Sequence, residues 1–204
     1  MQHDDTYQTI LRPTEGLYKD KGSKFIALAF PVKTEEEIKA QLQMVKGQFH
    51  DARHHCYAWV TGFNQENHRT NDDGEPSGTA GKPILGQLNA FGLTNTLIVV
   101  VRYFGGTKLG VRGLINAYKG ASIDALKNGQ IVTRTICHHY RLSFQYAQMN
   151  DVMRVLKEYD LPQHAHTFDL QCELEFSVRA RLSNQVRGIF ESIPGVKINF
   201  LQVK

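Results

Sequence analysis

The sequence predicts an α+β protein of two domains, because its pattern of segments changes near residue 130. Before that point, helical and strand-like segments are mixed and two glycine-rich turns interrupt them. After it, the expected order is strand, helix, strand, strand, helix, strand over roughly 70 residues, which is typical of a ferredoxin-like fold. We therefore expect an N-terminal α/β domain at residues 1–130 and a ferredoxin-like βαββαβ domain at residues 131–204.

The elements of the first domain follow from turn chemistry and periodicity. Strand-like segments at 17–19 and 24–32 flank the turn-forming tetrapeptide Asp20–Ser23, so we expect a hairpin. Thr34, followed by three glutamates, is an N-cap that begins a helix ending near Phe49. The elements expected after it are a strand at 55–62, a polar loop at 63–69, an irregular loop at 71–83, a short helix with Pro83 near its first turn, a strand at 96–103 and a helix from Gly110 to about Lys127.

The second domain is predicted from a shorter set of signals. In residues 171–179, apolar and polar side chains alternate, which indicates a half-buried strand. The remaining elements are expected as a strand at 135–145, a helix at 149–159, a short strand at 165–169, a helix at 183–193 and a final strand at 196–203.

Composition limits the classes of protein that this chain can belong to. A formal net charge of +4, from 24 basic and 20 acidic residues, permits nucleic-acid binding but does not require it. Three widely spaced cysteines without a C-x-x-C motif argue against a disulfide framework and fit a reducing compartment. The segment Met1–Asp5 has no apolar core, unlike a signal peptide, and no apolar run approaches the length of a membrane helix. We expect a cytoplasmic protein that has no membrane partner.

The segment after the apolar run Leu97–Val101 is a candidate anion site. The strand ends in Gly105-Gly106, and a helix starts after Gly110, an arrangement that leaves backbone N–H groups free beside Lys108 and Arg112. Alternatively, the glycines only permit a tight turn. A Walker loop is absent, because Pro76 stands at its first glycine position before Gly81, and Val111 replaces the lysine that should follow Gly110.

The earlier glycine-rich loop carries Asp72, Asp73 and Glu75, which could hold Mg²⁺ or act as acid and base. Alternatively, these side chains cap their own turns in a solvated loop. Ser77 lacks the glycines of a nucleophile elbow. The histidines near Cys56 supply no second matched pair for a closed zinc shell, so we expect no metal site.

Four aromatic residues in or beside the predicted strands have two possible roles. Tyr57, Trp59, Tyr103 and Phe104 could stack bases on a sheet face, although such residues more often belong to a core.

Two segments, Asp73–Pro83 and Arg102–Gly110, together resemble the conserved block of the IMPACT family. The resemblance extends over residues 15–130 and is consistent with the order of the two domains. It implies an N-terminal domain similar to ribosomal-protein domains and to domain IV of elongation factor G, and a C-terminal domain similar to domain V. Eukaryotic members regulate translation by interfering with activation of an amino-acid-starvation kinase. This sequence shows no counterpart of their additional N-terminal interaction domain, so the kinase role is not carried over, and the resemblance assigns no catalytic residue.

The leading functional hypothesis is a non-enzymatic regulatory protein linked to translation, which binds RNA or the ribosome through a phosphate-accepting surface and needs no cofactor. One alternative is a metal-dependent hydrolase that uses the Asp72/Asp73/Glu75 loop. Another is a protein-interaction module that uses the C-terminal sheet, with a protein partner in translation control. The residues expected to bind phosphate are Ser77, Thr79, Lys82, Arg102, Gly105, Gly106, Thr107, Lys108 and Arg112.

Overall fold

The computed structural model describes residues 5–167, 169 and 171–204. The chain forms two compact units, Tyr7–Arg134 and Thr135–Lys204, the second joined by residues 5–6. Both units combine helices with sheets, so the predicted two-domain α+β class is confirmed. The segment Met1–Asp4, expected not to be a signal peptide, and residue 168 of the expected strand 165–169 lie outside the described residues.

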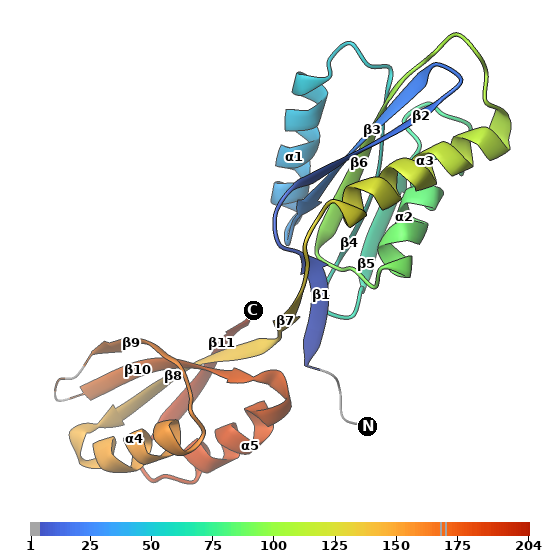
Figure 1. Ribbon diagram of the computed structural model, residues 1–204. Coiled ribbons are helices and arrows are strands. Elements are labelled where there is room, and N and C mark those ends of the chain that lie inside the picture. The colour runs from blue at the N-terminus through green and yellow to red at the C-terminus, as the bar shows by residue number, and fades with distance from the viewer. Residues whose placement is uncertain (1–4, 168, 170) are drawn as a thin grey trace. The chain divides into compact units, whose positions relative to one another are not determined.

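The unit Tyr7–Arg134 is built on a five-stranded antiparallel sheet in the order β2-β3-β6-β4-β5. Helix α1 lies on one face of this sheet, and helices α2 and α3 lie on the other (Figure 1). The strands are β2 (Thr14–Asp20), β3 (Ser23–Pro31), β4 (His54–Thr61), β5 (Asn67–Asn71) and β6 (Thr96–Tyr103), and the helices are α1 (Glu35–Gln48), α2 (Gly81–Ala90) and α3 (Gly110–Lys127).

The central strand β6 is apolar from Leu97 to Val101 because helices cover both of its faces. Ile98 and Val100 contribute to the core under α2 and α3. Leu97, Val99 and Val101 contribute to the core under α1. A strand buried on both faces has no position at which a polar residue would reach water. The apolar run that predicted a buried strand therefore reflects the three-layer arrangement.

Three strands of this unit differ from the prediction. The loop expected at 63–69 is wrong from Asn67 onward, because β5 pairs with β4 as a polar strand at the edge of the sheet. Residues on an exposed edge need not be apolar, so the sequence carries no alternating signal there. In addition, β1 (Thr6–Ile10) and β7 (Ile131–Thr135) pair in a separate two-stranded sheet. The prediction placed one strand at 135–145. In the structure, β7 ends at Thr135 and β8 begins at Cys137.

The second unit has the predicted ferredoxin-like topology. Its elements are β8 (Cys137–Gln145), α4 (Met149–Glu158), β9 (Gln163–Thr167), β10 (Gln171–Arg179), α5 (Ala180–Glu191) and β11 (Lys197–Val203), with a 3₁₀ turn at Tyr146–Gln148 before α4. The sheet order is β11-β8-β10-β9 and all pairs are antiparallel. Alternate residues of β8 and β10 pack against α4 and α5, which confirms the half-buried strand predicted for residues 171–179.

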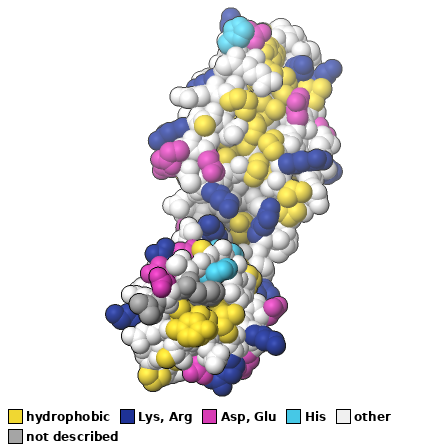
Figure 2. All heavy atoms as spheres, turned by 90° about the vertical axis from the view of Figure 1, so that its left-hand side faces the viewer, with side chains coloured by type: hydrophobic (Ala, Val, Ile, Leu, Met, Phe, Trp, Pro, Cys, Tyr) yellow, Lys and Arg dark blue, Asp and Glu magenta, His cyan; other side chains and the backbone are white. Residues whose placement is uncertain are grey.

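The surface carries charges of both signs. Figure 2 shows Lys and Arg side chains spread over one face of both units and interspersed with Asp and Glu, rather than gathered in one patch. This distribution agrees with the small net charge of +4. Among the helices of the described residues, none has the length and apolar character needed to cross a bilayer.

Candidate functional site

Asp72 organises the first glycine-rich loop. Its carboxylate accepts hydrogen bonds from the N–H groups of Gly78 (2.8 Å), Ala80 (3.0 Å) and Gly81 (2.8 Å). Burial raises the pKa of Asp72, but these three donors outweigh it, so the pKa lies below its ordinary value. The N-cap residue of α2, Ala80, has no side chain that could accept hydrogen bonds from the first turn of the helix. The carboxylate of Asp72 accepts them instead. Asp72 is therefore a structural anchor of the loop.

Asp73 ties the same loop to β4. Its carboxylate accepts the N–H of His55 at 2.7 Å, and its carbonyl lies 2.8 Å from Nδ1 of His54. Both aspartates are thus occupied by groups of the fold, as the turn-capping interpretation expects. Within the described part of the chain, no group of three His, Cys, Asp or Glu side chains is placed to hold a metal ion.

Glu75 connects the two glycine-rich segments. Its Oε1 accepts a hydrogen bond from Nη1 of Arg102 at 2.6 Å and another from the hydroxyl of Tyr118 at 2.8 Å. The side chains of Glu75 and Arg102 are only 4% and 8% exposed, so the ion pair is buried. A buried charge is tolerated only when it is paired and hydrogen-bonded. This buried pair therefore joins the two glycine-rich segments.

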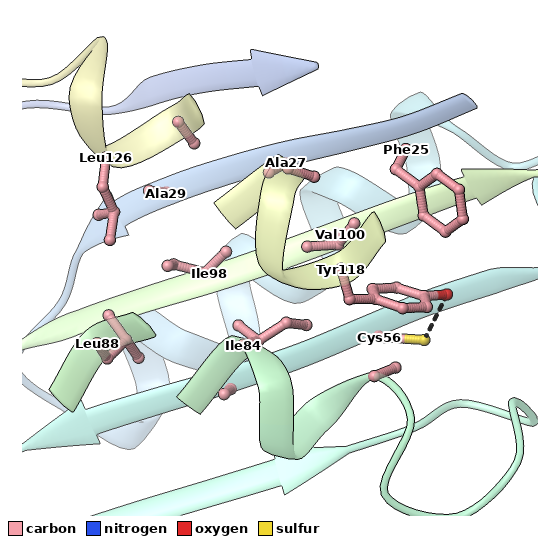
Figure 3. Close-up of a cluster of buried hydrophobic side chains, with 14 of the residues drawn as sticks. Phe25, Ala27, Ala29, Cys56, Ile84, Leu88, Ile98, Val100, Tyr118 and Leu126 are labelled. Atoms are coloured by element: carbon pink, nitrogen blue, oxygen red, sulfur yellow. Dashed lines mark hydrogen bonds between the residues drawn. The ribbon is translucent and has the colours of Figure 1, made fainter. Parts of the chain in front are cut away.

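Tyr118 extends this network into the core. It points from α3 toward Cys56 on β4, whose Sγ lies 3.2 Å from the Tyr118 hydroxyl (Figure 3). Burial raises the pKa of Cys56 to about 12, and it also raises the pKa of Tyr118. Cys56 therefore remains a neutral thiol at physiological pH and is not a reactive nucleophile.

Arg102 has a buried N–H group, at Nε, that its ion pair with Glu75 does not use. Among the residues that the structure describes, none accepts a hydrogen bond from its buried Nε. Its guanidinium carbon lies 5.4 Å from the ring centroid of Phe25 and 5.6 Å from that of Phe104. A buried donor without an acceptor is unfavourable, so this N–H group lowers the stability of the fold.

Gly105, one of the residues expected to bind phosphate, is engaged in contacts within the fold. Its N–H already donates to Oγ of Ser23 at 3.1 Å. A Cβ at this position would lie 1.9 Å from the carbonyl carbon of Gly22, so the glycine permits close packing of two turns. A long-range contact thus occupies the N–H group of Gly105, and its expected role in binding phosphate stays a prediction.

The N-terminal end of α3 has no side-chain cap. Its N-cap residue, Leu109, provides no side-chain hydrogen bond, and no acidic residue stands in the first turn of this fully described helix. Gly110 enters the helix with φ +71°, and Lys108 and Arg112 are exposed beside it. Free N–H groups and the helix dipole favour an anion at such an end.

A cavity of about 410 Å³ lies at this helix start. Arg102 and Lys108 supply its basic groups, and most of the remaining wall is apolar. Its lining residues are Glu75, Pro76, Arg102, Phe104, Lys108, Leu109, Gly110, Val111 and Leu114.

Other residues expected to bind phosphate lie outside the lining of this cavity. Thr79 is buried and donates its hydroxyl to the carbonyl of Pro76 at 2.6 Å, and its expected role stays a prediction. Ser77, Lys82, Gly106, Thr107 and Arg112 are exposed. The apolar wall of the cavity was not predictable from the sequence, because Leu109, Val111 and Leu114 fit the ordinary pattern of an amphipathic helix.

Comparisons with known proteins agree with the family resemblance of the two glycine-rich segments. The Impact N-terminal domain model matches residues 21–126, which include both. The IMPACT family member YigZ of Escherichia coli (strain K12) is 39% identical over 142 residues, covering 69% of this chain and 70% of that protein. YvyE of Bacillus subtilis (strain 168), another IMPACT family member, is 38% identical over 153 residues, covering 75% and 70%.

A crystal structure described as that of a hypothetical protein is similar over both units. It is 30% identical, covers 97% of this chain and 98% of its own, and superposes with a TM-score of 0.71. The family model spans more than half of the chain, and the two bacterial relatives match most of it. On this evidence the protein belongs to the IMPACT family.

Proposed function

We propose that this protein is a translation-linked regulatory protein that binds RNA, free or within the ribosome, at the start of α3. Membership in the IMPACT family supports the link to translation. The observation that carries RNA binding is the start of α3, which has no side-chain cap and opens on a cavity lined by Arg102 and Lys108.

Phosphate oxygens are the acceptors that these donors fit. The first-turn N–H groups of α3 and the side chains of Lys108 and Arg112 would surround a phosphate. Glu75 offsets the charge of Arg102, which leaves Lys108 and Arg112 as the cations of this helix start. Neutralising two or three phosphates of a single strand gives a slope of about −1.5 to −2 in log affinity against log salt.

Fluorescence anisotropy with a labelled single-stranded RNA tests this proposal. Replacing Lys108 and Arg112 by alanine should weaken binding and reduce the salt slope by about 1.4, which is about 0.7 for each cation removed. Lys127→Ala is the matched control, because Lys127 is an exposed lysine of α3 at the opposite end, about 22 Å from Arg112. Binding that is absent or insensitive to salt, for RNA and for ribosomal subunits, would contradict the proposal.

The hydrolase alternative gains no support from the geometry, because Asp72, Asp73 and Glu75 are each engaged with groups of the fold.

The protein-interaction alternative has one specific observation in its favour. Phe200, Leu201 and Val203 are exposed on β11, an edge strand of its sheet. Such a strand suits an extended segment of a partner protein. Phe200→Ser and Val203→Ser should then abolish co-purification of that partner without weakening RNA binding.

A further inference from the structure

Phe104 is an exposed aromatic side chain within the candidate site. It follows β6 directly and is 57% exposed, although phenylalanine side chains are most often buried. The guanidinium of Arg102 lies over its ring at 5.6 Å. This cation–π contact restrains the ring in its exposed position.

Two cavities adjoin at this ring. Phe104 and Arg102 line the 410 Å³ cavity and also a second cavity of about 340 Å³. The second cavity is more polar and includes Arg53 and His54. Phe104 therefore borders both cavities, while the Arg102 guanidinium covers one face of its ring.

The larger cavity combines an apolar wall with an anion site at one end. Pro76, Leu109 and Val111 provide apolar surface beside Phe104. Arg102, Lys108 and the first turn of α3 provide donors. Its volume lies in the range of cavities that hold small ligands, which is roughly 300–1,000 Å³. A ligand that matches this wall has a flat ring joined to an anionic group.

The local charge indicates a singly charged anion. Glu75 neutralises Arg102 through the 2.6 Å ion pair, so Lys108 is the remaining formal charge among the residues that line the larger cavity. A phosphodiester carries one negative charge and matches one cation. RNA in a duplex keeps its bases stacked and paired, so it presents phosphates without an accessible base face.

On these observations, we propose that the larger cavity binds one unpaired nucleotide of an RNA strand, with its base against the Phe104 ring and its phosphate at the start of α3. This inference rests on the proposed RNA-binding function and specifies the form of RNA that is recognised. The bound strand is single-stranded at this point, and the contact tolerates different bases because each base has a stacking face.

The test uses the full chain and a short single-stranded RNA that contains 2-aminopurine. Phe104→Leu should weaken binding about 5- to 150-fold, the range expected for loss of one base–aromatic stack, and abolish the quenching of 2-aminopurine that binding causes. Phe104→Tyr should retain both, because tyrosine keeps the ring. Tyr146→Leu is the matched control, since Tyr146 is 71% exposed in the other unit. The thermal midpoint of each variant verifies folding.

Three outcomes would overturn the inference while RNA binding stands. These are equal affinity of wild type and Phe104→Leu, quenching that persists in Phe104→Leu, and equal affinity for a duplex of the same sequence. In each of them, the Lys108/Arg112 double variant would still weaken binding. If that variant and the wild type both fail to bind any RNA, the proposed function fails and the inference fails with it.

Discussion

Glu75 illustrates how one side chain can organise a site. A single oxygen accepts hydrogen bonds from β6, through Arg102, and from α3, through Tyr118. Both donors come from elements distant in sequence, so the contact holds the loop, the sheet and the helix together. The sequence shows Glu75 only as one of three loop carboxylates.

Removing Glu75 should be costly because the charge of Arg102 would remain buried without a partner. We expect Glu75→Ala to lower the free energy of unfolding by about 3–5 kcal/mol, measured by urea denaturation. The exposed pair Arg141–Glu175 is the control, and Glu175→Gln should cost less than about 1 kcal/mol. Replacing Glu75 and Arg102 together by apolar residues should recover part of the loss. Equal losses for the buried and exposed glutamates would contradict this reasoning.

The contact of Gly105 with Gly22 and Ser23 predicts a second effect at the residue scale. In Gly105→Ala, the new Cβ would overlap backbone atoms at 1.9 and 2.1 Å, so the two turns must separate and stability must fall. Gly47→Ala in α1 is the matched control, because no atom lies within 4 Å of the added Cβ. It should stabilise the protein by up to about 1 kcal/mol. Thermal denaturation of both variants distinguishes the two roles of glycine.

At the scale of elements, the loop before α2 depends on one ionised carboxylate. The pKa of Asp72 is lowered in the folded state, because three N–H groups stabilise the charged form more than burial opposes it. Its contribution to stability is therefore complete above the ordinary aspartate pKa of about 3.9 and is lost as the pH falls through the lower folded value.

Asp72→Asn tests this dependence. The amide cannot accept hydrogen bonds from all three N–H groups, so the variant should lose about 1–3 kcal/mol at pH 7. The difference from wild type should shrink below about pH 4, because the Asp72 carboxyl of the unfolded chain takes up a proton there while the folded one is still ionised. Asp151→Asn, at an exposed pair with Arg154, should show little effect at either pH. A difference that stays constant across this range would show that the charge of Asp72 is unimportant.

Helices and buried strands were the elements best predicted from the sequence, because their signals are local. Thr34 caps α1 as expected, with its hydroxyl accepting the N–H of Glu37 at 3.2 Å. The edge strand β5 was missed because its sequence is polar and its pairing with β4 depends on a distant segment. The predicted likeness of the first unit to domain IV of elongation factor G stays a prediction.

At the scale of the whole molecule, each unit has its own hydrophobic core. We therefore expect the units to unfold as separate cooperative transitions. Phe176→Ala should lower the stability of the second unit by about 3–5 kcal/mol and leave the first unit unchanged. Trp59, the single tryptophan, reports on the first unit alone by fluorescence, whereas far-ultraviolet circular dichroism reports on both. A Trp59 transition that shifts with the circular dichroism would indicate one cooperative molecule.

The sequence by itself determined the class of the fold, the ferredoxin-like order of the second unit and the two glycine-rich segments, because periodicity, capping residues and turn chemistry are local properties of the chain. Only the tertiary structure decided what those segments do. Glu75 and Arg102 pair across 27 positions, and Gly105 packs against Ser23 across 82. Contacts over such separations depend on how the sheet brings distant turns together. For this reason the same segments that identified a candidate phosphate site did not show which of its N–H groups and carboxylates remain free for a ligand.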